Sequence, residues 1–494
     1  MTAELYPMFV AGADFPGSGD AFLDVDNPYT GEVWARVPVA TEEDVARAVD
    51  AAAKAFHEGP WGSMLPAARA KLMRALGELI ERDAEQLTRT QVMENGKAIR
   101  EQAAQTNGLA AHLDYFAGVA QLRGGDTIPV SVPNTFAYTV REPVGVVAAI
   151  TPWNSPLALL MWKLAPALAA GNTVVVKPSE VSPVSTILLA RLAQEAGFPP
   201  GVINVVTGDA ATGTALVRHP EVRKIAFTGS TAVGRQIGRI AGERLVSASL
   251  ELGGKSPNIV FDDADLPAAV EGVVGGVFAA AGQTCIAGSR VLIHEAVYEE
   301  FSRRLVERVG RIRLGDPLDW DTEVGTIASP RQFEKVQRCI ATAKEEGAEL
   351  LVGGGRPSAP GLQGGLFIEP TIFGNVTPEM EIVREEVFGP VVVLLKFASD
   401  DEAVRLANAT PYGLAAGVWT RDVKRVHRLA RRLLAGTIWV NTYRKTNYAT
   451  PFGGFKDSGL GRENGAHAVD EFTEEKLVWL DLGDGVADPF NPFA

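Results

Sequence analysis

The sequence has very few cysteines: only Cys285 and Cys339 occur in 494 residues. Two cysteines cannot form the disulfide framework of a small secreted domain, and neither lies in a CxxC pair or near histidines at metal-ligand spacing. The six histidines do not cluster either, so we expect no metal site. A chain with so few thiols suits a reducing compartment, and we expect a cytoplasmic protein.

Long apolar runs and basic clusters are also missing. The apolar stretch 157–170 contains Lys163 and Pro166 and is too short to cross a membrane. The first ten residues lack the basic and apolar regions of a signal peptide. The net charge is −13, spread along the chain, which opposes binding to a phosphate backbone. We therefore expect neither a membrane nor a nucleic acid as a partner.

The composition and residue patterns of the sequence predict a folded chain. Hydrophobic residues make up 46% and charged residues 22%, and the length predicts about three folding units. Thr41 followed by acidic residues predicts a capped helix, and the apolar residues from Leu72 to Leu87 predict an amphipathic helix. In 123–143, β-branched and aromatic residues alternate with polar ones between glycine and proline, which predicts a strand pair that reaches away from the body.

From 144 to 251, short apolar runs alternate with helical stretches, the pattern of a parallel sheet covered on both faces. Polar or glycine-rich segments follow each run. Because ligands of open α/β sheets bind outside the carboxyl ends of the strands, we expect these segments to face one crevice. They are 151–154, 177–180, 207–209, 228–230 and 251–254.

After 254 the alternation resumes in a second α/β unit. It includes a helix rich in glycine and alanine that we expect to extend to Ala281, a helix near 331–347, and apolar runs typical of buried strands. The segment 451–465 suggests a glycine-rich loop, and 474–482 a last edge strand. The fold class is thus α/β, with two doubly wound parallel-sheet units.

Two features predict dinucleotide binding. Gly229 and Ser230 end a strand before a helix, where backbone amides and a hydroxyl would favour an anion. Lys177 and Glu180 follow another strand and can bind a ribose diol. An ordinary tight turn and a surface ion pair are the alternatives for these two features, but a dinucleotide explains all the strand ends together.

Cys285 is the candidate nucleophile. It follows Gly282, Gln283 and Thr284 in a loop, where a thiolate would be exposed and where free backbone amides would stabilise it. The alternative is a small buried side chain. Cys339 lies among apolar residues at helical spacing and is most simply explained by packing.

Glu251 and Asn154 complete the candidate chemistry. Glu251 ends an apolar strand, and burial there would raise its pKa as a general base requires. The alternative is a structural carboxylate bound to the amides of Gly253 and Gly254. The Asn154 amide can donate to an oxyanion, or it can cap the helix that begins near Pro156.

The segments TPWN, KPSE, FTGSTAVG, LELGGKSPN, GQTCIAGSR, EEVFGP and PFGGFKDSG resemble, in this order, the NAD(P)-dependent aldehyde dehydrogenase superfamily. The resemblance covers essentially the whole chain. It implies that Cys285 is the nucleophile, Glu251 the general base and Asn154 the oxyanion donor. It also implies coenzyme binding by Ile150, Thr151, Pro152, Trp153, Lys177, Ser179, Glu180, Gly208, Phe227, Gly229, Ser230, Val233, Leu252, Gly253, Gln332, Lys335, Glu386 and Phe388.

The resemblance further implies oxidation of an aldehyde through a thioester that water hydrolyses. Glu180 would repel a 2′-phosphate, so we expect NAD, with NADP as the alternative. A dehydrogenase that transfers the acyl group to coenzyme A and a dinucleotide-binding protein without turnover are the alternative functions. Tyr443, Tyr448 and Phe452 would line an aromatic-friendly pocket or pack in the core.

The resemblance also implies a division of the chain and its assembly. We expect a coenzyme-binding domain from 1–122 and 144–253 and a catalytic domain from 254–457. Segments 123–143 and 458–494 are expected to form oligomerisation strands and a C-terminal segment of a homodimer or homotetramer.

Overall fold

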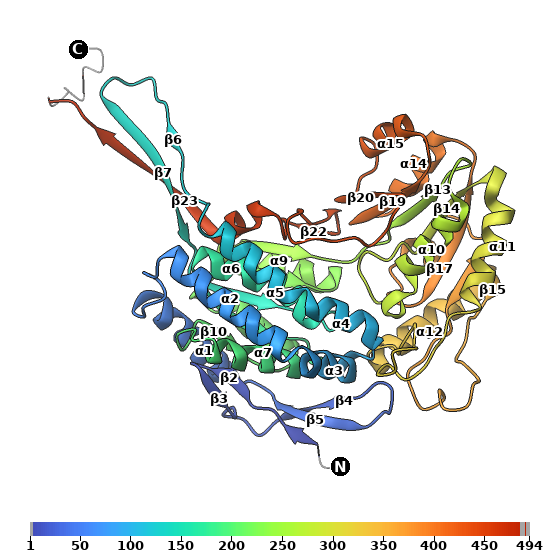
Figure 1. Cartoon of the computed structure of the whole chain (residues 1–494), viewed down its shortest axis with the longest axis horizontal. Coiled ribbons are helices and arrows are strands. Elements are labelled where there is room, and N and C mark those ends of the chain that lie inside the picture. The colour runs from blue at the N-terminus through green and yellow to red at the C-terminus, as the bar shows by residue number, and fades with distance from the viewer. Residues whose placement is uncertain (1–2, 485–489, 491–494) are drawn as a thin grey trace.

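The computed structural model describes residues 3–484 and Phe490, and it shows two α/β units and a projecting β arm (Figure 1). The first unit is built on an eight-stranded sheet in the order β22-β12-β11-β8-β9-β10-β2-β3. Its five central strands are parallel, as predicted. These strands are β8 (Val146–Ile150), β9 (Thr173–Lys177), β10 (Ile203–Val205), β11 (Val222–Thr228) and β12 (Ser247–Glu251).

Alternate residues of these strands pack on opposite faces of the sheet. Val174 and Val176 belong to one apolar cluster, and Val175 belongs to another. The first cluster includes α2 (Pro66–Arg82), α5 (Leu109–Val119), α6 (Pro156–Ala170) and α7 (Val184–Glu195). The second includes α1 (Glu42–His57), α8 (Ala210–Arg218) and α9 (Thr231–Arg244). Two helical layers therefore cover the sheet and explain its continuous apolar strands.

The N-terminal region contains more elements than its sequence pattern indicated. Thr41 caps α1 in a capping box, as expected. The amphipathic run from Leu72 to Leu87 is divided, because α2 ends at Arg82 and Leu87 lies in α3 (Ala84–Asn95). The further elements here are α4 (Ile99–Asn107), β1 (Glu4–Leu5), β2 (Met8–Val10), β3 (Ala13–Phe15), β4 (Phe22–Asp26) and β5 (Val33–Pro38).

The second unit has a seven-stranded sheet in the order β15-β16-β17-β14-β13-β19-β20. Six strands are parallel, and the edge strand β15 is antiparallel. The strands are β13 (Pro257–Val260), β14 (Arg290–His294), β15 (Glu349–Val352), β16 (Thr371–Gly374), β17 (Val391–Phe397), β19 (Ala415–Trp419) and β20 (Thr437–Val440).

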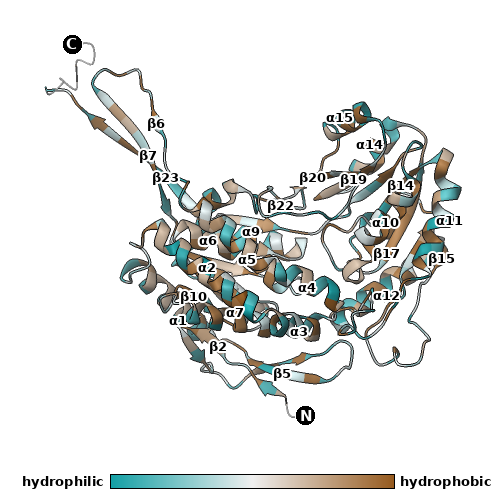
Figure 2. Cartoon of the chain, viewed as in Figure 1, coloured by the Kyte–Doolittle hydropathy of each residue, from teal (hydrophilic) through white to brown (hydrophobic). Residues whose placement is uncertain are grey.

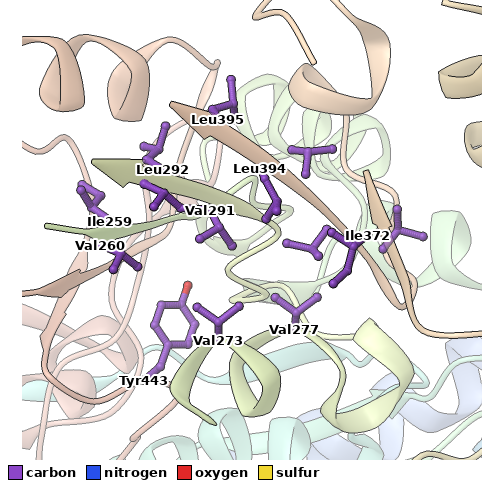
Figure 3. Packing of buried hydrophobic residues seen from close by; sticks show 14 of the residues in the cluster. Ile259, Val260, Val273, Val277, Val291, Leu292, Ile372, Leu394, Leu395 and Tyr443 are labelled. Carbon is purple, nitrogen blue, oxygen red and sulfur yellow. The ribbon is translucent and has the colours of Figure 1, made fainter. Parts of the chain in front are cut away.

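Helices pack on this second sheet through apolar residues. Figure 3 shows Val273 and Val277 of α10 facing Val291 and Leu394 of the sheet. Outer helices such as α11 carry hydrophilic residues as well (Figure 2). The helices are α10 (Leu266–Val277), α11 (Tyr298–Val309), α12 (Pro330–Glu345), α13 (Glu381–Arg384), α14 (Asp400–Asn408) and α15 (Val423–Ala430).

The arm is a three-stranded sheet of β6 (Thr127–Ile128), β7 (Thr135–Pro143) and β23 (Thr473–Asp481), and it projects from the first unit (Figure 1). This confirms the predicted projecting strands and the last edge strand. Residues 459–460 instead form β22 (Gly459–Leu460), which joins the edge of the first sheet next to β12. The end of the predicted segment 458–494 lies outside the described residues.

Candidate active site

The carboxyl ends of the parallel strands of the first unit lie at one edge of its sheet, because β12, β11, β8, β9 and β10 are consecutive neighbours. A cavity of about 150 Å³ lies at this edge, and we call it the coenzyme cavity. It brings together twelve of the predicted site residues from both units, with Leu159 and Thr228. The twelve are Pro152, Trp153, Asn154, Gly229, Ser230, Leu252, Gly253, Cys285, Gln332, Lys335, Glu386 and Phe388.

The other predicted coenzyme residues do not line this cavity, although they lie at or near the same edge of the sheet. Lys177 ends β9 and is buried, whereas Glu180 is half exposed, and their Nζ and Oε2 atoms are 3.6 Å apart. Burial lowers the pKa of Lys177, and the Glu180 carboxylate opposes that shift. The pair is thus not a simple surface ion pair. The remaining residues of this group are Ile150, Thr151, Ser179, Gly208, Phe227 and Val233.

The second unit closes the coenzyme cavity with the segment 386–388. The Gln332 amide donates to the carbonyl oxygens of Val387 (3.0 Å) and Phe388 (2.9 Å), and Phe388 meets Trp153 edge to face. The Glu386 carboxylate accepts the Gly254 amide at 3.0 Å. Burial raises the pKa of Glu386. Gln332 therefore holds the loop in place as well as lining the cavity.

The start of α9 could hold a phosphate group, but one of the donors expected there, the Gly229 amide, is already in use. Ser230 is the N-cap, as predicted, and its hydroxyl accepts the Val233 amide. The Gly229 amide is not available, because it donates to the carbonyl oxygen of Glu251 at 3.0 Å in the pairing of β11 with β12. The buried Thr231 hydroxyl has no hydrogen-bond partner among the described residues, and it supplies an unused polar group at this helix terminus.

The chain approaches Cys285 through a left-handed turn. The predicted helix up to Ala281 is wrong at its end: α10 stops at Val277, and Ala280 and Ala281 have positive φ angles of 54° and 52°. Cys285 follows this turn and is partly exposed. It lines the coenzyme cavity and also a second cavity of about 1000 Å³, which we call the large cavity. The sulfur therefore lies where two binding spaces meet.

The Cys285 side chain is a thiol rather than the stabilised thiolate that its sequence context suggested. Burial raises its pKa to about 12, and the carboxylates of Glu251 and Glu386 add to the shift. The backbone amides of Cys285 and Ile286 favour the thiolate but are outweighed. The sequence identified the donors but not the two acidic neighbours, which come from other parts of the chain.

Asn154 does not cap a helix, since Ser155 occupies the N-cap position of α6. Its Nδ2 atom donates to the carbonyl oxygen of Gln283 at 2.8 Å. Because an amide nitrogen carries two protons, one remains for a further acceptor. Asn154 lines both cavities with Cys285, so the second proton is available at their junction.

Glu251 is buried, and neither of its carboxylate oxygens has a hydrogen-bond partner among the described residues. The structural alternative is therefore wrong for both amides: Glu251 accepts neither that of Gly253 nor that of Gly254, and the Gly254 amide binds Glu386 instead. Burial raises the pKa of Glu251 well above its ordinary value, and the Glu463 charge adds to this, whereas Lys163 and Arg462 oppose it. Glu251 lines neither cavity but interacts electrostatically with Cys285.

Lys163 and Glu463 are site residues that sequence analysis missed. Lys163 is fully buried in α6, and its Nζ donates to Glu463 at 2.6 Å and to the Thr228 hydroxyl at 2.5 Å. A single lysine inside an apolar helix was the available signal, because a lysine is rarely fully buried unless it is paired. Glu463 is 300 positions away, and nothing local marks it.

The large cavity has an aromatic wall near Cys285. Tyr443, Tyr448 and Phe452 line it, as predicted, together with Trp162, which meets Phe452 edge to face. The Tyr443 hydroxyl donates to the carbonyl oxygen of Ile286 at 3.0 Å. Tyr443 also packs beside Val273 in the core (Figure 3). This residue therefore both lines the cavity and packs in the core.

Within 3–484 and Phe490, no three His, Cys, Asp or Glu side chains are grouped so that they could hold a metal ion. In the same part of the chain, no helix combines the length and apolar character needed to span a membrane.

Comparison with known proteins gives consistent matches. The model of the aldehyde dehydrogenase family matches residues 16–478. Betaine aldehyde dehydrogenase of Bacillus subtilis is 42% identical over 98% of this chain and 99% of its own length. An aldehyde dehydrogenase of Emericella nidulans is 45% identical over 97% of this chain and 96% of its own length.

Solved structures show the same fold. The NAD+ complex of an aldehyde dehydrogenase from Bacillus cereus is 44% identical, covers 97% of both chains and superposes with a TM-score of 0.95. Betaine aldehyde dehydrogenase from Staphylococcus aureus in complex with NAD+ is 39% identical over 99% of this chain and 96% of that one, with a TM-score of 0.96.

Proposed function

Because the chain belongs to the aldehyde dehydrogenase family, we propose that it oxidises an aldehyde to the carboxylic acid with NAD+, through a thioester on Cys285 that water hydrolyses. The observation that carries this proposal is the position of Cys285 and Asn154, which line both the coenzyme cavity and the large cavity. A nucleophile and an oxyanion donor at that junction can act on an aldehyde from one side while a hydride leaves to the other.

The first step is the attack of Cys285 on the carbonyl carbon. The thiol gives its proton to solvent water as the sulfur–carbon bond forms, and the carbonyl oxygen gains negative charge in a tetrahedral thiohemiacetal. Asn154 donates the Nδ2 proton that Gln283 does not use. The bond to Gln283 fixes the amide before the substrate arrives, so the donor requires no reorganisation during the reaction.

NAD, when bound, supplies the hydride acceptor. The residues of the coenzyme cavity would hold it near Cys285, with Trp153 and Phe388 as the apolar wall. The buried hydroxyls of Thr151 and Thr231 have no hydrogen-bond partners among the described residues and fit a polar ligand along this edge. The thioester then remains on the Cys285 sulfur.

Glu251 acts in the last step as the general base that takes a proton from water. The water oxygen bonds to the thioester carbon, the carbon–sulfur bond breaks, and the carboxylic acid leaves the Cys285 sulfur. Its raised pKa suits this role, because a stronger base removes the proton more readily. Lys163 and Arg462 oppose the rise and favour the ionised carboxylate. The presence of this base favours hydrolysis over transfer to coenzyme A, since relatives that use coenzyme A commonly lack it.

The coenzyme preference follows from Glu180. Its half-exposed carboxylate would repel a 2′-phosphate and accept hydrogen bonds from a free ribose diol. Steady-state rates with NAD and NADP test this in the wild type and in Glu180→Ala. We expect the variant to lose preference for NAD, and a wild type that prefers NADP would contradict the reasoning.

The test of the proposed function is the variant Cys285→Ala with a panel of short aliphatic, long aliphatic, aromatic and charged aldehydes. We expect NADH formation to be lost while NAD binding is kept. Unchanged NADH formation would contradict the nucleophile assignment. Products formed by the wild type with and without coenzyme A separate hydrolysis from acyl transfer, and the absence of turnover with every aldehyde would favour a non-catalytic dinucleotide-binding protein.

The proposal also includes assembly and location. Exposed apolar residues on the arm support a homodimer or homotetramer, in which another copy covers them: Phe136, Leu477, Trp479 and Leu480. Light scattering of Trp479→Glu would show a smaller particle than the wild type. We retain 1–122 with 144–253 as the coenzyme-binding domain and 254–457 as the catalytic domain. The two unpaired cysteines support a cytoplasmic location.

A further inference from the structure

Three consecutive residues before Cys285 have left-handed backbone conformations. Ala280 and Ala281 have φ and ψ of 54°, 28° and 52°, 35°, and Gly282 has φ of 70°. Glycine adopts this region freely, but alanine does so at a cost because its Cβ approaches the following carbonyl oxygen. Two such alanines persist only when the surrounding structure holds them.

Side chains hold the Ala280 peptide from both sides. The Glu101 carboxylate, on α4, accepts the Ala280 amide through Oε2 at 2.7 Å. The Gln283 side chain donates to the Ala280 carbonyl oxygen at 3.2 Å and is itself fixed by the carbonyl of Thr326 and the amide of Ala328. Glu101 is the one of these two holders that comes from the first unit and lines the large cavity.

The other oxygen of Glu101 binds Arg444 at 2.5 Å. Arg444 also lines the large cavity, has a positive φ of 58°, and donates to the carbonyl oxygen of Gly275 in α10 at 3.2 Å. Arg444 and Glu101 are both about four-fifths buried. A single carboxylate therefore joins the turn before the nucleophile to a cation in the cavity wall.

A second cation keeps this carboxylate ionised. The pKa of Glu101 is lowered by Arg444 and Lys97, against the opposing effect of burial. The Lys97 ammonium donates to the Ser155 hydroxyl at 2.8 Å, next to the oxyanion donor Asn154. An ionised acceptor makes the stronger hydrogen bond to the Ala280 amide.

We propose that Glu101 is a positioning residue, which holds the left-handed turn before Cys285 in its reactive position and links that turn to Arg444 in the wall of the large cavity. This rests on the proposed function, because it requires Cys285 to be the nucleophile. Glu101 touches none of the reacting atoms and acts through the backbone.

The test compares Glu101→Ala and Glu101→Gln in the full-length protein. We expect Glu101→Ala to lower kcat by about tenfold or more, with the dissociation constant for NAD within twofold of the wild type. The rate at which iodoacetamide alkylates Cys285 should change at least threefold, because the surroundings of the sulfur change. Glu101→Gln should recover kcat to within about threefold of the wild type, since its amide oxygen can still accept the Ala280 amide.

Asp263 provides a matched control. Like Glu101 it joins a backbone amide, that of Arg421, to an arginine, Arg425, at 3.0 Å each. It lines neither cavity. Asp263→Ala and Asp263→Asn should leave kcat and the alkylation rate within twofold of the wild type. Equal losses in the Glu101 and Asp263 series would overturn the proposal in favour of general destabilisation.

Other outcomes are equally decisive. Wild-type kcat and alkylation rate in Glu101→Ala would overturn the proposal, as would Glu101→Gln being no better than Glu101→Ala. Where Glu101→Ala does not fold, Arg444→Met replaces it in the test. This variant keeps the hydrogen bond between Glu101 and the Ala280 amide, so kcat should fall by only about threefold. A loss above tenfold would show that the contact with Arg444 matters more than the bond to Ala280, and it would overturn the proposal. Alkylation reports on the surroundings of the Cys285 sulfur without turnover, whereas the activity of Cys285→Ala tests the proposed function. The two failures can therefore be told apart.

Discussion

Substitutions in the buried pair of Lys163 and Glu463 should affect stability and pH dependence differently. Both single variants should lose stability, but they should shift the pH dependence of kcat in opposite directions. Lys163→Met removes the cation from Glu463, and Glu463→Gln removes the anion from Lys163. The nitrogen and oxygen are 2.6 Å apart, and the side chains are 0% and 4% exposed. Each single variant therefore leaves one charge buried without its partner.

The expected cost of each single variant is about 3–5 kcal/mol in the free energy of unfolding, the range for breaking one side of a buried ion pair. Lys163→Met also loses the 2.5 Å bond to the Thr228 hydroxyl. The double variant leaves no unpaired charge, so its cost should be smaller than the sum of the two. Urea denaturation of the three variants at one pH measures the difference.

The two single variants should shift the pH dependence of kcat in opposite directions. Hydrolysis requires ionised Glu251, so kcat rises with pH through the pKa of that carboxyl group. Lys163 lowers this pKa and Glu463 raises it. The rise should therefore move to higher pH in Lys163→Met and to lower pH in Glu463→Gln, provided deacylation limits the rate.

Pre-steady-state measurement of NADH shows whether deacylation is limiting, because a burst then precedes the steady rate. Shifts of the same sign in both variants would refute the electrostatic account of Glu251. Additive costs in the double variant would show that the two side chains stabilise the fold independently.

Two further predictions concern the reacting groups themselves. Asn154→Ala should lower kcat by about 10²–10³-fold with little change in NAD affinity, the usual effect of losing one oxyanion donor; a kcat within tenfold of the wild type, measured by NADH absorbance, would exclude that role. In the protein without coenzyme, alkylation of Cys285 should accelerate about tenfold per pH unit from pH 7 to 9, because its thiol has a pKa of about 12; mass spectrometry that shows a plateau in this range would contradict the raised pKa.

Local sequence features predicted much of the fold and site. The apolar runs in 144–251 identified five parallel strands because each run is buried on both faces of the sheet. Three of the five segments after those strands, 151–154, 228–230 and 251–254, contribute residues to one cavity, because parallel strands place their carboxyl ends together. Segments 177–180 and 207–209 do not line it. Asn154 was found at a strand end and Cys285 in a loop after a predicted helix, both also from the resemblance, and both line the two cavities.

Other features depend on residues that are distant in the chain. The helix before Cys285 was predicted too long because alanine favours a helix, and no local signal shows that Glu101 holds Ala280 in a left-handed turn. Likewise β7 pairs with β23 across more than 300 residues. Propensity describes only the local preference of the backbone, whereas these contacts impose the conformation from outside.

The sequence by itself determined the parallel sheets, the strand ends and the identity of the thiol, amide and carboxylate, because these follow from the order of residues along the chain. Only the tertiary structure decided how readily these groups ionise and which charged groups lie near them. It buried Glu251 with no hydrogen-bond partner among the described residues, placed Lys163 and Glu463 near that carboxylate, and brought Glu251 and Glu386 near Cys285. The physical reason is that a pKa depends on solvent exclusion and on charges within a few ångströms, whatever their separation in sequence.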